Sequence, residues 1–493
     1  MKIFNPEPKP GLSLSNFRKI SDNGFGDRNN SYAYSMAWFK DHLYVGTGRA
    51  TLCFARQFLT LGQVSISNNI EVWPVEFPHA IYSPEFEHTQ ARAEIWRYSP
   101  LSNHWERVYQ APIIISTEGG EISRDFGYRA MVVFQGKSDP EPALYVATCA
   151  RRLGPGPVIL RSENGKDFLP VSKPGLVGDP ITSLRSLVPF KGRLFTAGDI
   201  QRKITKGHRS KAGIPAIYES SDPVQGEWRV VNEPGFGDPD NNTVYEFASF
   251  GDYLYVGTEN NNGFQIWRTS AEGEPPYQWT KIISDGAGRN SLNQATVSMV
   301  VFKDALYIGT GIQNGGYDRA NNIGPAGAEI IRINHDGSWE LIMGDARDGK
   351  YPLSGLSSGF NTLLNGYLWR MSVHEGWLYA GTMGWGVFLR YSNLKDKPSR
   401  GVQIINQIGL ENIVENQGGF DLWRSSDGEN WLPVTRQGFG NPFNYGVRNI
   451  VSTPHGLFVG TANPFGPRVA VQKNEEWVYV DNPDGGLEIW QGN

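Results

Sequence analysis

Apolar and polar residues alternate in short runs along most of this 493-residue chain. Residues 243–269, TVYEFASFGDYLYVGTENNNGFQIWRT, hold an apolar run to Phe250, the turn Gly251-Asp252, a second run LYVGT, a polar loop and a third run QIWR. Period-two alternation bounded by Gly, Asp and Asn is typical of β-strands joined by tight turns. A fourth run ends at Ile283, so the pattern predicts a four-stranded antiparallel unit.

The second run recurs along the chain, which predicts a repeat fold. Its copies begin at Leu43, Leu144, Leu194, Leu254, Leu306, Leu378 and Leu457. Seven copies of a four-stranded unit are the signature of a seven-bladed β-propeller. We expect an all-β fold in which residues 1–493 form a single domain, with blades that start near residues 33, 128, 184, 244, 296, 368 and 447.

The two ends of the sequence complement each other. The chain finishes with LEIWQGN, a third run without a fourth, and begins with SNFRKISDNGFGD, a fourth run without the first three. We therefore predict that a strand at residues 15–20 completes the last blade and closes the ring. Closure would remove the sheet edges that otherwise pair with other chains.

Extra residues gather on one face of the predicted ring. The loops from second to third strands are lengthened at residues 49–92, 199–213, 311–327, 383–419 and 462–485. Long loops on a rigid scaffold are the usual location of binding and catalysis. The aromatic and His residues of these insertions fit three roles, which are a packed lid, a homodimer contact and direct contact with a ligand.

The inner strands should begin at the same face, so that their first residues surround the mouth of a central channel. Alternation predicts that one residue of each strand faces the channel: Ser35, Ala130, Ser186, Glu246, Ser298, Arg370 and Asn449. Small residues are the expected filler there, which makes Glu246 and Arg370 the exceptions. The residue before each should face between blades, although long side chains at a strand end can reach the mouth: Tyr34, Arg129, Arg185, Tyr245, Val297, Trp369 and Arg448.

These side chains predict a site for an anionic or hydroxylated small molecule. Guanidinium groups bind carboxylate, phosphate or halide, and Tyr or Glu can accept a proton from a substrate hydroxyl. The predicted catalytic residues are Arg370, Glu246, Tyr245 and Tyr34. The predicted substrate-binding residues are Arg129, Arg185, Arg448, Trp369 and Trp385. The alternative is structural, with arginines that bond strand-edge carbonyls or pair with Glu across the channel.

Composition and motif content argue against several classes of partner and cofactor. A net charge of −4 argues against a general affinity for nucleic acid or anionic membranes. The sequence holds no long apolar span and no signal-peptide pattern, so we expect a cytoplasmic protein. Two cysteines are too few for a disulfide framework, HExxH and P-loop motifs are absent, and we expect no cofactor. Asp238 and Asp240 are the one candidate for structural Ca²⁺, although turn geometry already explains them.

The motifs GFGDxxN, LYVGTxN and EIWR occur as GFGDRNN at Gly24, LYVGTEN at Leu254 and EIWR at Glu94. Their combination resembles a widespread group of bacterial propeller repeat proteins and extends over nearly the whole chain outside the insertions. The resemblance implies the propeller fold and no defined activity. The turn SSDGENW at Ser425 resembles the Asp-box turns of sialidase-type propellers, which are structural.

Two families of propeller enzymes offer comparisons for the chemistry. Arg129, Arg185 and Arg370 with Tyr245-Glu246 are similar to the arginine triad and Tyr-Glu pair of sialidases, but sialidases have six blades and an Arg-Ile-Pro motif that this chain lacks. The cyanobacterial alkylating enzymes of the cylindrocyclophane type look like propellers that use Arg and Tyr to couple an alkyl halide to a resorcinol. Their calcium-domain repeats are absent here.

The leading hypothesis is therefore a cofactor-independent propeller enzyme of specialised metabolism, of the transferase or lyase type, acting on a small molecule. A non-catalytic interaction scaffold is the competing hypothesis. A sialidase-like glycosidase is a third.

Overall fold

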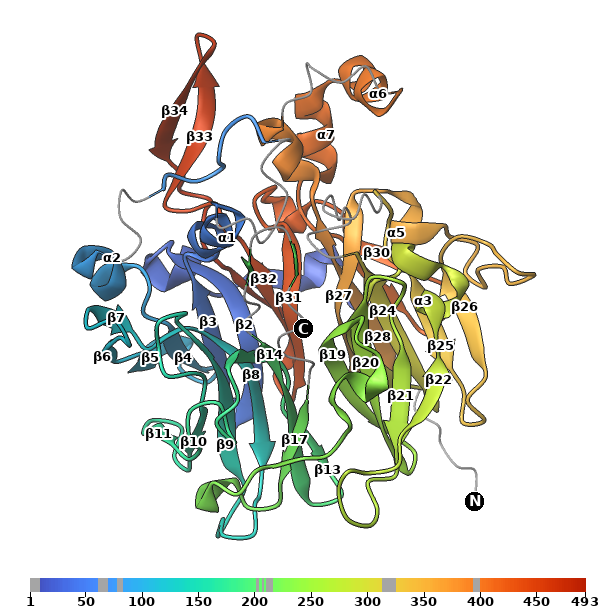
Figure 1. The fold of residues 1–493 in the computed structure, drawn as a ribbon. Helices are drawn as coiled ribbons and strands as arrows, with labels where there is room; N and C mark the ends of the chain where they lie inside the picture. The colour runs from blue at the N-terminus through green and yellow to red at the C-terminus, as the bar shows by residue number, and fades with distance from the viewer. Residues whose placement is uncertain are drawn as a thin grey trace.

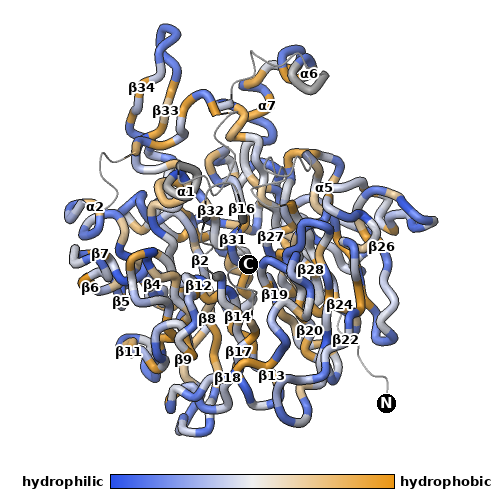
Figure 2. The backbone as a smooth tube through the Cα atoms, in the orientation of Figure 1, coloured by the Kyte–Doolittle hydropathy of each residue, from blue (hydrophilic) through white to orange (hydrophobic). Residues whose placement is uncertain are grey.

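The computed structural model describes residues 9–60, 70–77, 83–200, 204–205, 208–209, 216–312, 325–392 and 400–493. β-Strands dominate the described chain, which confirms the predicted all-β class. Most strands belong to antiparallel groups of four (Figure 1). Figure 2 shows hydrophobic residues along the strands and mostly hydrophilic residues at the turns.

The first six groups follow the order of the chain, and in most of them the first two strands form the longest hairpin. The first three groups are β2 (Asn30–Phe39), β3 (His42–Arg49), β4 (Glu94–Ser99) and β5 (His104–Gln110); β8 (Asp125–Phe134), β9 (Ala143–Ala150), β10 (Ile159–Ser162) and β11 (Leu169–Pro170); and β12 (Ile181–Leu184) with β13 (Val188–Phe190), β14 (Arg193–Ile200), β17 (Ile217–Ser220) and β18 (Arg229–Val230).

The next three groups repeat this arrangement. They are β19 (Asn241–Phe250), β20 (Tyr253–Asn260), β21 (Ile266–Thr269) and β22 (Thr280–Ile283); β23 (Ala295–Phe302), β24 (Ala305–Gly311), β25 (Ile330–Ile333) and β26 (Trp339–Met343); and β27 (Asn365–His374), β28 (Trp377–Gly384), β29 (Leu422–Ser425) and β30 (Leu432–Thr435).

The last group unites the two ends of the described chain. It consists of β31 (Gly446–Thr453), β32 (Gly456–Ala462), β35 (Ile489–Gly492) and β1 (Phe17–Lys19). Phe17 lies opposite Gly492 and Lys19 opposite Trp490, so the predicted pairing of the N-terminal strand with the C-terminal strand is present. The Phe17 ring packs 5.1 Å from the ring of Phe439, which anchors β1 in the core.

A hydrogen-bonded latch recurs in most groups. In it, the Asn of the GFGDxxN motif donates both to a carbonyl of its own turn and to the polar residue that begins the EIWR motif. The Asn residues are Asn30, Asn241, Asn293, Asn365 and Asn444, and their third-strand acceptors are Glu94, Gln265, Glu329, Asp421 and Glu488. The turns are η2 (Asn23–Gly26), η5 (Pro234–Gly237), α3 (Asp285–Gly288), α5 (Ser358–Asn361) and η8 (Gly438–Gly440).

An aromatic pair accompanies four of these latches. The Phe of the turn stacks on the Trp of the third strand, with ring centres 4.5–4.8 Å apart, for Phe25–Trp96, Phe236–Trp267, Phe360–Trp423 and Phe439–Trp490. Each of these Phe residues has a φ of 57–59°, a conformation that costs roughly 1–3 kcal/mol for a residue with a side chain. The most prominent motifs of the sequence thus hold the groups together.

The insertions carry helices and short strands of their own. Their elements are α1 (Thr51–Thr60), α2 (Pro84–Thr89), η7 (Gly386–Tyr391), α6 (Arg400–Ile408), α7 (Leu410–Gln417), β33 (Arg468–Lys473) and β34 (Glu476–Asp481), together with the short strands β15 (Ile204–Thr205) and β16 (His208–Arg209). Of these, α1, α6, α7, β33 and β34 lie at the top of the view (Figure 1). Parts of the insertions at 49–92, 199–213, 311–327 and 383–419 lie outside the described residues.

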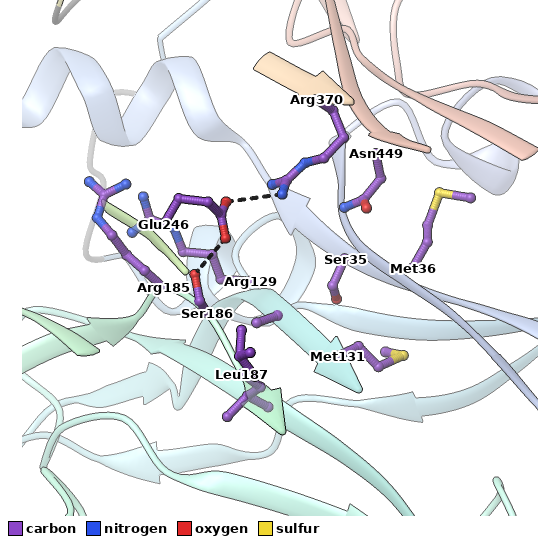
Figure 3. A pocket seen from close by; sticks show the side chains of 12 residues that line it. Ser35, Met36, Arg129, Met131, Arg185, Ser186, Leu187, Glu246, Arg370 and Asn449 are labelled. Carbon is purple, nitrogen blue, oxygen red and sulfur yellow. Dashed lines mark hydrogen bonds and ion pairs between the residues drawn. The ribbon is translucent and has the colours of Figure 1, made fainter. Parts of the chain in front are cut away.

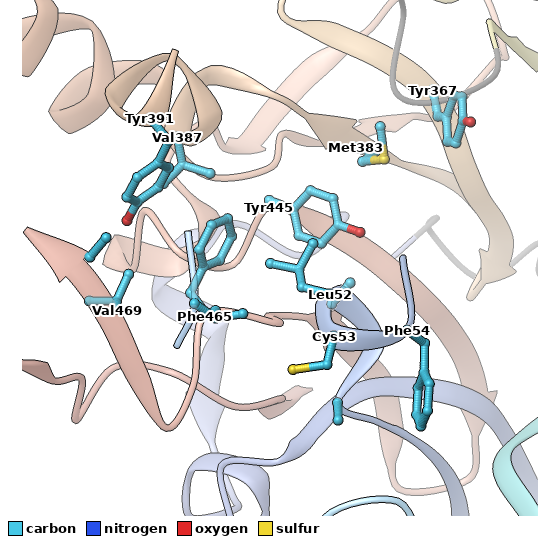
Figure 4. Close-up of a cluster of buried hydrophobic side chains, with 14 of the residues drawn as sticks. Leu52, Cys53, Phe54, Tyr367, Met383, Val387, Tyr391, Tyr445, Phe465 and Val469 are labelled. Atoms are coloured by element: carbon cyan, nitrogen blue, oxygen red, sulfur yellow. The ribbon is translucent and has the colours of Figure 1, made fainter. Parts of the chain in front are cut away.

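Three insertions pack into one lid. Leu52 and Phe54 from α1, Val387 and Tyr391 from η7, and Phe465 and Val469 near β33 belong to the same buried cluster (Figure 4). Val75 forms a β-bridge with Val469, and the amide of Glu71 donates to the carbonyl of Tyr391 at 2.8 Å. These insertions therefore pack against one another, which is the first of the three roles expected for them.

No helix in the described part of the chain is long and apolar enough to cross a membrane.

Candidate functional site

β-Bulges at one height of the inner strands position the site. In the pairing of first with second strands, the register shifts around Tyr34, Arg129, Tyr245, Val297, Trp369 and Arg448. Arg185 lies in the interruption between β12 and β13. A bulge inserts one extra residue and redirects its side chain, so simple alternation no longer applies to it. The side chains nevertheless lie between neighbouring groups, as parity predicted, since the Tyr34 ring lies against Gly127 of the next group and the Trp369 ring against Gly446.

All members of the channel-facing set except Ser298 line a cavity of about 120 Å³ (Figure 3). Its walls include Ser35, Ala130, Ser186, Glu246, Arg370 and Asn449, together with Arg129 and Arg185. Several small members of the set also join neighbouring groups. Ser35 Oγ donates to the carbonyl of Tyr128 at 2.7 Å, and Asn449 Nδ2 donates to the carbonyl of Tyr34 at 2.9 Å.

Glu246 and Arg370 form an ion pair inside this cavity, from β19 and β27. Arg370 Nη1 donates to Glu246 Oε2 at 3.1 Å, and Ser186 Oγ donates to Glu246 Oε1 at 3.2 Å (Figure 3). Arg370 Nε is buried without a hydrogen-bond partner among the described residues. The pair thus leaves one buried donor of Arg370 without a partner in the described chain.

Asp199 is the shared ion-pair partner of two of the predicted arginines. Its Oδ1 accepts from Arg185 Nε at 2.5 Å, and its Oδ2 accepts from Arg129 and, at 2.8 Å, from Ser183 Oγ. Burial opposes ionisation, but Arg185 and Arg129 outweigh it and hold the pKa of Asp199 below its usual range. Asp199 lies at the end of β14, where an insertion begins, and nothing in the repeat pattern marked it.

Arg448 differs from these three arginines because aromatic rings, rather than a carboxylate, surround it. Its guanidinium lies 4.7 Å from the centre of the Tyr34 ring and 5.3 Å from the centre of the Trp369 ring. The residue is 5% exposed, and Nε and Nη1 have no hydrogen-bond partner in the described chain. Burial and the nearby Arg370 lower the pKa of Arg448 to about 10, so it is a cation at neutral pH.

The two predicted tyrosines lie beside arginines. Arg185 stacks 3.9 Å from the centre of the Tyr245 ring, and Arg129 lies 6.0 Å from that of Tyr34. Neither hydroxyl has a hydrogen bond within the described residues. Burial raises the pKa of Tyr34, which therefore holds its proton at neutral pH and is better suited to donate one than to accept one.

An aromatic cluster that sequence reasoning missed adjoins the Trp369 ring, on which Arg448 stacks. The hydroxyls of Tyr32 and Tyr445 are hydrogen-bonded to each other, and both rings contact the ring of Trp369. Tyr445 is also part of the lid cluster (Figure 4). Tyr445 lies three residues before Arg448 and Tyr32 two before Tyr34, a proximity that could have marked them as neighbours of the site.

One predicted residue lies away from the others. Trp385 is the N-cap of η7, and its indole Nε1 donates to the carbonyl of Leu363 at 3.0 Å. It does not line the cavity, and the residues that stand beside the lining without being part of it are Tyr34, Tyr245, Trp369 and Arg448. The pairing of Trp369 and Trp385 as one aromatic wall is therefore not seen in the described residues.

The described residues contain no group of three or more His, Cys, Asp or Glu side chains that could hold a metal ion. At the candidate Ca²⁺ turn, Asp238 accepts from the amide of Asp240 and from Gln265 Nε2, while Asp240 accepts from Asn262 Nδ2. These carboxylates thus take part in the turn and in the latch around Asn241. His79 lies outside the described residues, and His88 contacts Glu121.

Comparison with known proteins assigns no family. No family model and no curated protein matches the chain. Similar solved structures include a puromycin-hydrolyzing peptidase of Mycobacterium tuberculosis, at 10% identity and a TM-score of 0.43, covering 98% of this chain and 56% of that one. Another is the GH74 xyloglucanase of Xanthomonas campestris, at 12% identity and a TM-score of 0.43, covering 96% and 55%.

A third similar structure is RS223-β-xylosidase, at 13% identity and a TM-score of 0.32, covering 67% of this chain and all of that one. The present chain spans about half the length of the first two proteins. At these TM-scores the similarities carry no functional assignment, and function is argued from the chain itself.

Proposed function

We propose that the strand groups are the blades of a seven-bladed β-propeller of the bacterial repeat type, closed by β1. Seven groups can be traced through the described strands, and the first strands of most successive groups lie against each other. Two contacts support closure between the last and first groups. Tyr32 pairs with Ala462, and Asn449 Nδ2 donates to the carbonyl of Tyr34.

We further propose that this protein binds an anionic or hydroxylated small molecule at the channel mouth, as a cofactor-independent enzyme of specialised metabolism. The observation that carries the proposal is the meeting of Arg129, Arg185, Glu246 and Arg370, from separate strand groups, around one cavity. A purely structural channel would be filled by small or apolar side chains. Perturbed and partly unsatisfied charged groups in a concave site are typical of function.

The geometry favours acid–base chemistry, or alkylation assisted by Arg and Tyr. Arg370 Nη1 holds the Glu246 carboxylate, which can accept a proton from a substrate hydroxyl. Tyr34 and Tyr245 present hydroxyls that can donate a hydrogen bond to a leaving group or to a developing anion. Arg448 and Arg370 supply the positive charge that such a group needs.

The test is a ligand-observed NMR screen of small aromatic acids and phenols against the wild type, Arg370→Ala and Glu246→Ala. We expect ligands of the wild type to lose affinity by at least about tenfold in both variants, because each loses a charged hydrogen bond. Arg97→Ala is the control, since Arg97 pairs with Glu106 away from the cavity. Unchanged binding in both cavity variants, with lowered thermal stability, would show that the pair is structural.

The alternative function is a non-catalytic interaction scaffold that uses the insertions. The lid packs its apolar side chains within one cluster, which favours a closed cover over an open apolar docking face. A homodimer through the insertions stays a prediction, to be measured by sedimentation velocity. A sialidase-like site is less favoured because Asp199 binds Arg129 and Arg185, so these two are not free to join Arg370 in a triad.

A further inference from the structure

The four arginines of the mouth are not equivalent. Arg129 and Arg185 share Asp199, and Arg370 pairs with Glu246. Among the residues that the structure describes, Arg448 has neither an ion pair nor a hydrogen bond. Buried arginines are nearly always paired, because an unpaired charge in a low-dielectric interior is costly.

Among the described residues, the charged side chains around the mouth include one more cation than carboxylate. Asp199 and Glu246 supply two carboxylates. A third is Glu259 at the end of β20, whose negative charge helps to raise the pKa of Arg185. Four guanidinium groups thus face three carboxylates. A ligand with a single negative charge balances this set, whereas a doubly charged phosphate would leave an excess negative charge in a buried site.

One nitrogen of Arg448 is open to a ligand. Nε and Nη1 are fully buried between the rings of Tyr34 and Trp369. Nη2 is not among the fully buried unpaired atoms and makes no hydrogen bond to a described residue, so it is the nitrogen that remains for a ligand. The unpaired hydroxyl of Tyr34 belongs to the ring that the guanidinium stacks on.

We propose that Arg448 is the anion-binding residue of this site and that its ligand is a small, singly charged carboxylate. One carboxylate oxygen accepts from Arg448 Nη2, and the other accepts from a neighbouring donor such as the Tyr34 hydroxyl. A carboxylate has two oxygens and can accept from two separated donors at once, whereas a halide is a single atom. This inference rests on the proposed function, since it specifies the ligand class of the same site.

If Arg448 is a buried cation that serves ligand binding, its replacement should not lower the stability of the protein. Replacing Arg448 by Met retains the apolar stem between the two rings and removes an unpaired charge. Such a change is neutral or stabilising when the lost charge had no partner. We therefore expect Arg448→Met to melt at the wild-type temperature or above it, while losing the ligand.

The experiment measures melting temperature and calorimetric binding with acetate, benzoate, neutral benzamide, chloride and inorganic phosphate, at constant ionic strength. We expect benzoate and acetate to raise the melting temperature of the wild type in a saturable manner, with benzamide inactive. Affinity for benzoate should fall at least about 30-fold in Arg448→Met. Arg268→Met is the matched control, because Arg268 also stacks on tyrosines but lies on β21, in an outer position.

Each result decides between the two proposals. Carboxylates that bind equally well to Arg448→Met, or phosphate or chloride that binds more tightly than benzoate, would overturn this inference while leaving a small-molecule site at the mouth. A wild type that responds to none of the anions also overturns it, and the Arg370 and Glu246 variants then test the mouth independently. An Arg448→Met variant that melts well below the wild type would assign Arg448 to packing.

Discussion

At the scale of single residues, identical side chains acquire different roles from their partners. Arg129, Arg185 and Arg448 occupy corresponding places in their groups, and the sequence predicted one role for all three. Asp199 turns the first two into a fixed ion-pair network, whereas two aromatic rings leave Arg448 charged and unpaired. The partner, which comes from a different part of the chain, decides the role.

Asp199→Asn tests the network by its dependence on pH. Because the pKa of Asp199 is lowered on folding, its stabilising contribution is full above the unfolded pKa of about 4 and is lost as the pH falls through the lower folded value. We expect the variant to lose about 3 kcal/mol at pH 7. The gap to the wild type should narrow below about pH 4 in denaturant titrations.

Asp304→Asn is the control for this titration, since the Asp304–His335 pair is exposed and should contribute little. A gap that stays constant down to pH 3 would contradict the ion-pair account of Asp199.

The lowered pKa of Arg448 makes a second prediction for the binding of benzoate. The folded pKa of about 10 lies below the ordinary value of 12.5, so the residue loses its proton as the pH rises through about 10. Affinity should be constant from pH 7 to 9 and should fall above about pH 10, as calorimetry can measure. An affinity that is unchanged at pH 11 would mean that the cation of Arg448 is not what the ligand binds.

At the scale of elements, the repeated motifs act as latches and the bulges carry the site. Asn365 illustrates the latch, because Nδ2 donates to the Gly359 carbonyl and to Asp421 Oδ2, and Oδ1 accepts from Thr382 Oγ1, all at 3.0 Å. Replacing Asn365 by a residue without an amide leaves the Gly359 carbonyl and the Asp421 carboxylate without this donor. The latch is therefore a feature of stability, separate from ligand binding.

We expect Asn365→Ala to destabilise the protein by about 2–4 kcal/mol, because three buried hydrogen bonds are lost together. Thermal melting should show this as a lower midpoint, with benzoate affinity unchanged at temperatures where the variant is folded. Asn416→Ala, an exposed change on α7, serves as the control. A variant that melts with the wild type would show that the latch is dispensable.

The sequence predicted the strands and most of the polar residues that line the cavity because both follow from local periodicity. Leu43 to Leu457 mark the second strands, and Glu246 and Arg370 were identified as exceptions to small filler. The bulges at Tyr34 and Arg448 could not be predicted, since alternation assumes an unbroken register. Asp199 could not be predicted either, because its partners lie in other strands and only the fold brings them together.

At the scale of the whole molecule, the proposed ring depends on β1. Its three residues pair with β35, and Leu12, Phe17 and Phe439 share a buried cluster. Without β1, the β35 strand becomes an open edge next to solvent-exposed core. Open edges of this kind promote association between chains.

We expect deletion of residues 1–19 to lower the melting temperature and to cause concentration-dependent association, measured by light scattering. Deletion of residues 1–8 is the control, because it retains β1 and the contacts of Leu12. A 1–19 deletion that remains monodisperse and melts like the wild type would argue against closure by this strand.

The bulges also have a consequence for how such a site can diversify. Each extra residue stands outside the ladder of backbone hydrogen bonds, so its side chain can be exchanged without shifting the register of the strands beside it. In this chain the positions already hold residues as different as Tyr34, Val297, Trp369 and Arg448. A library randomised at the bulged positions alone should therefore yield folded proteins with new ligand preferences, which makes this ring of positions a natural starting point for directed evolution.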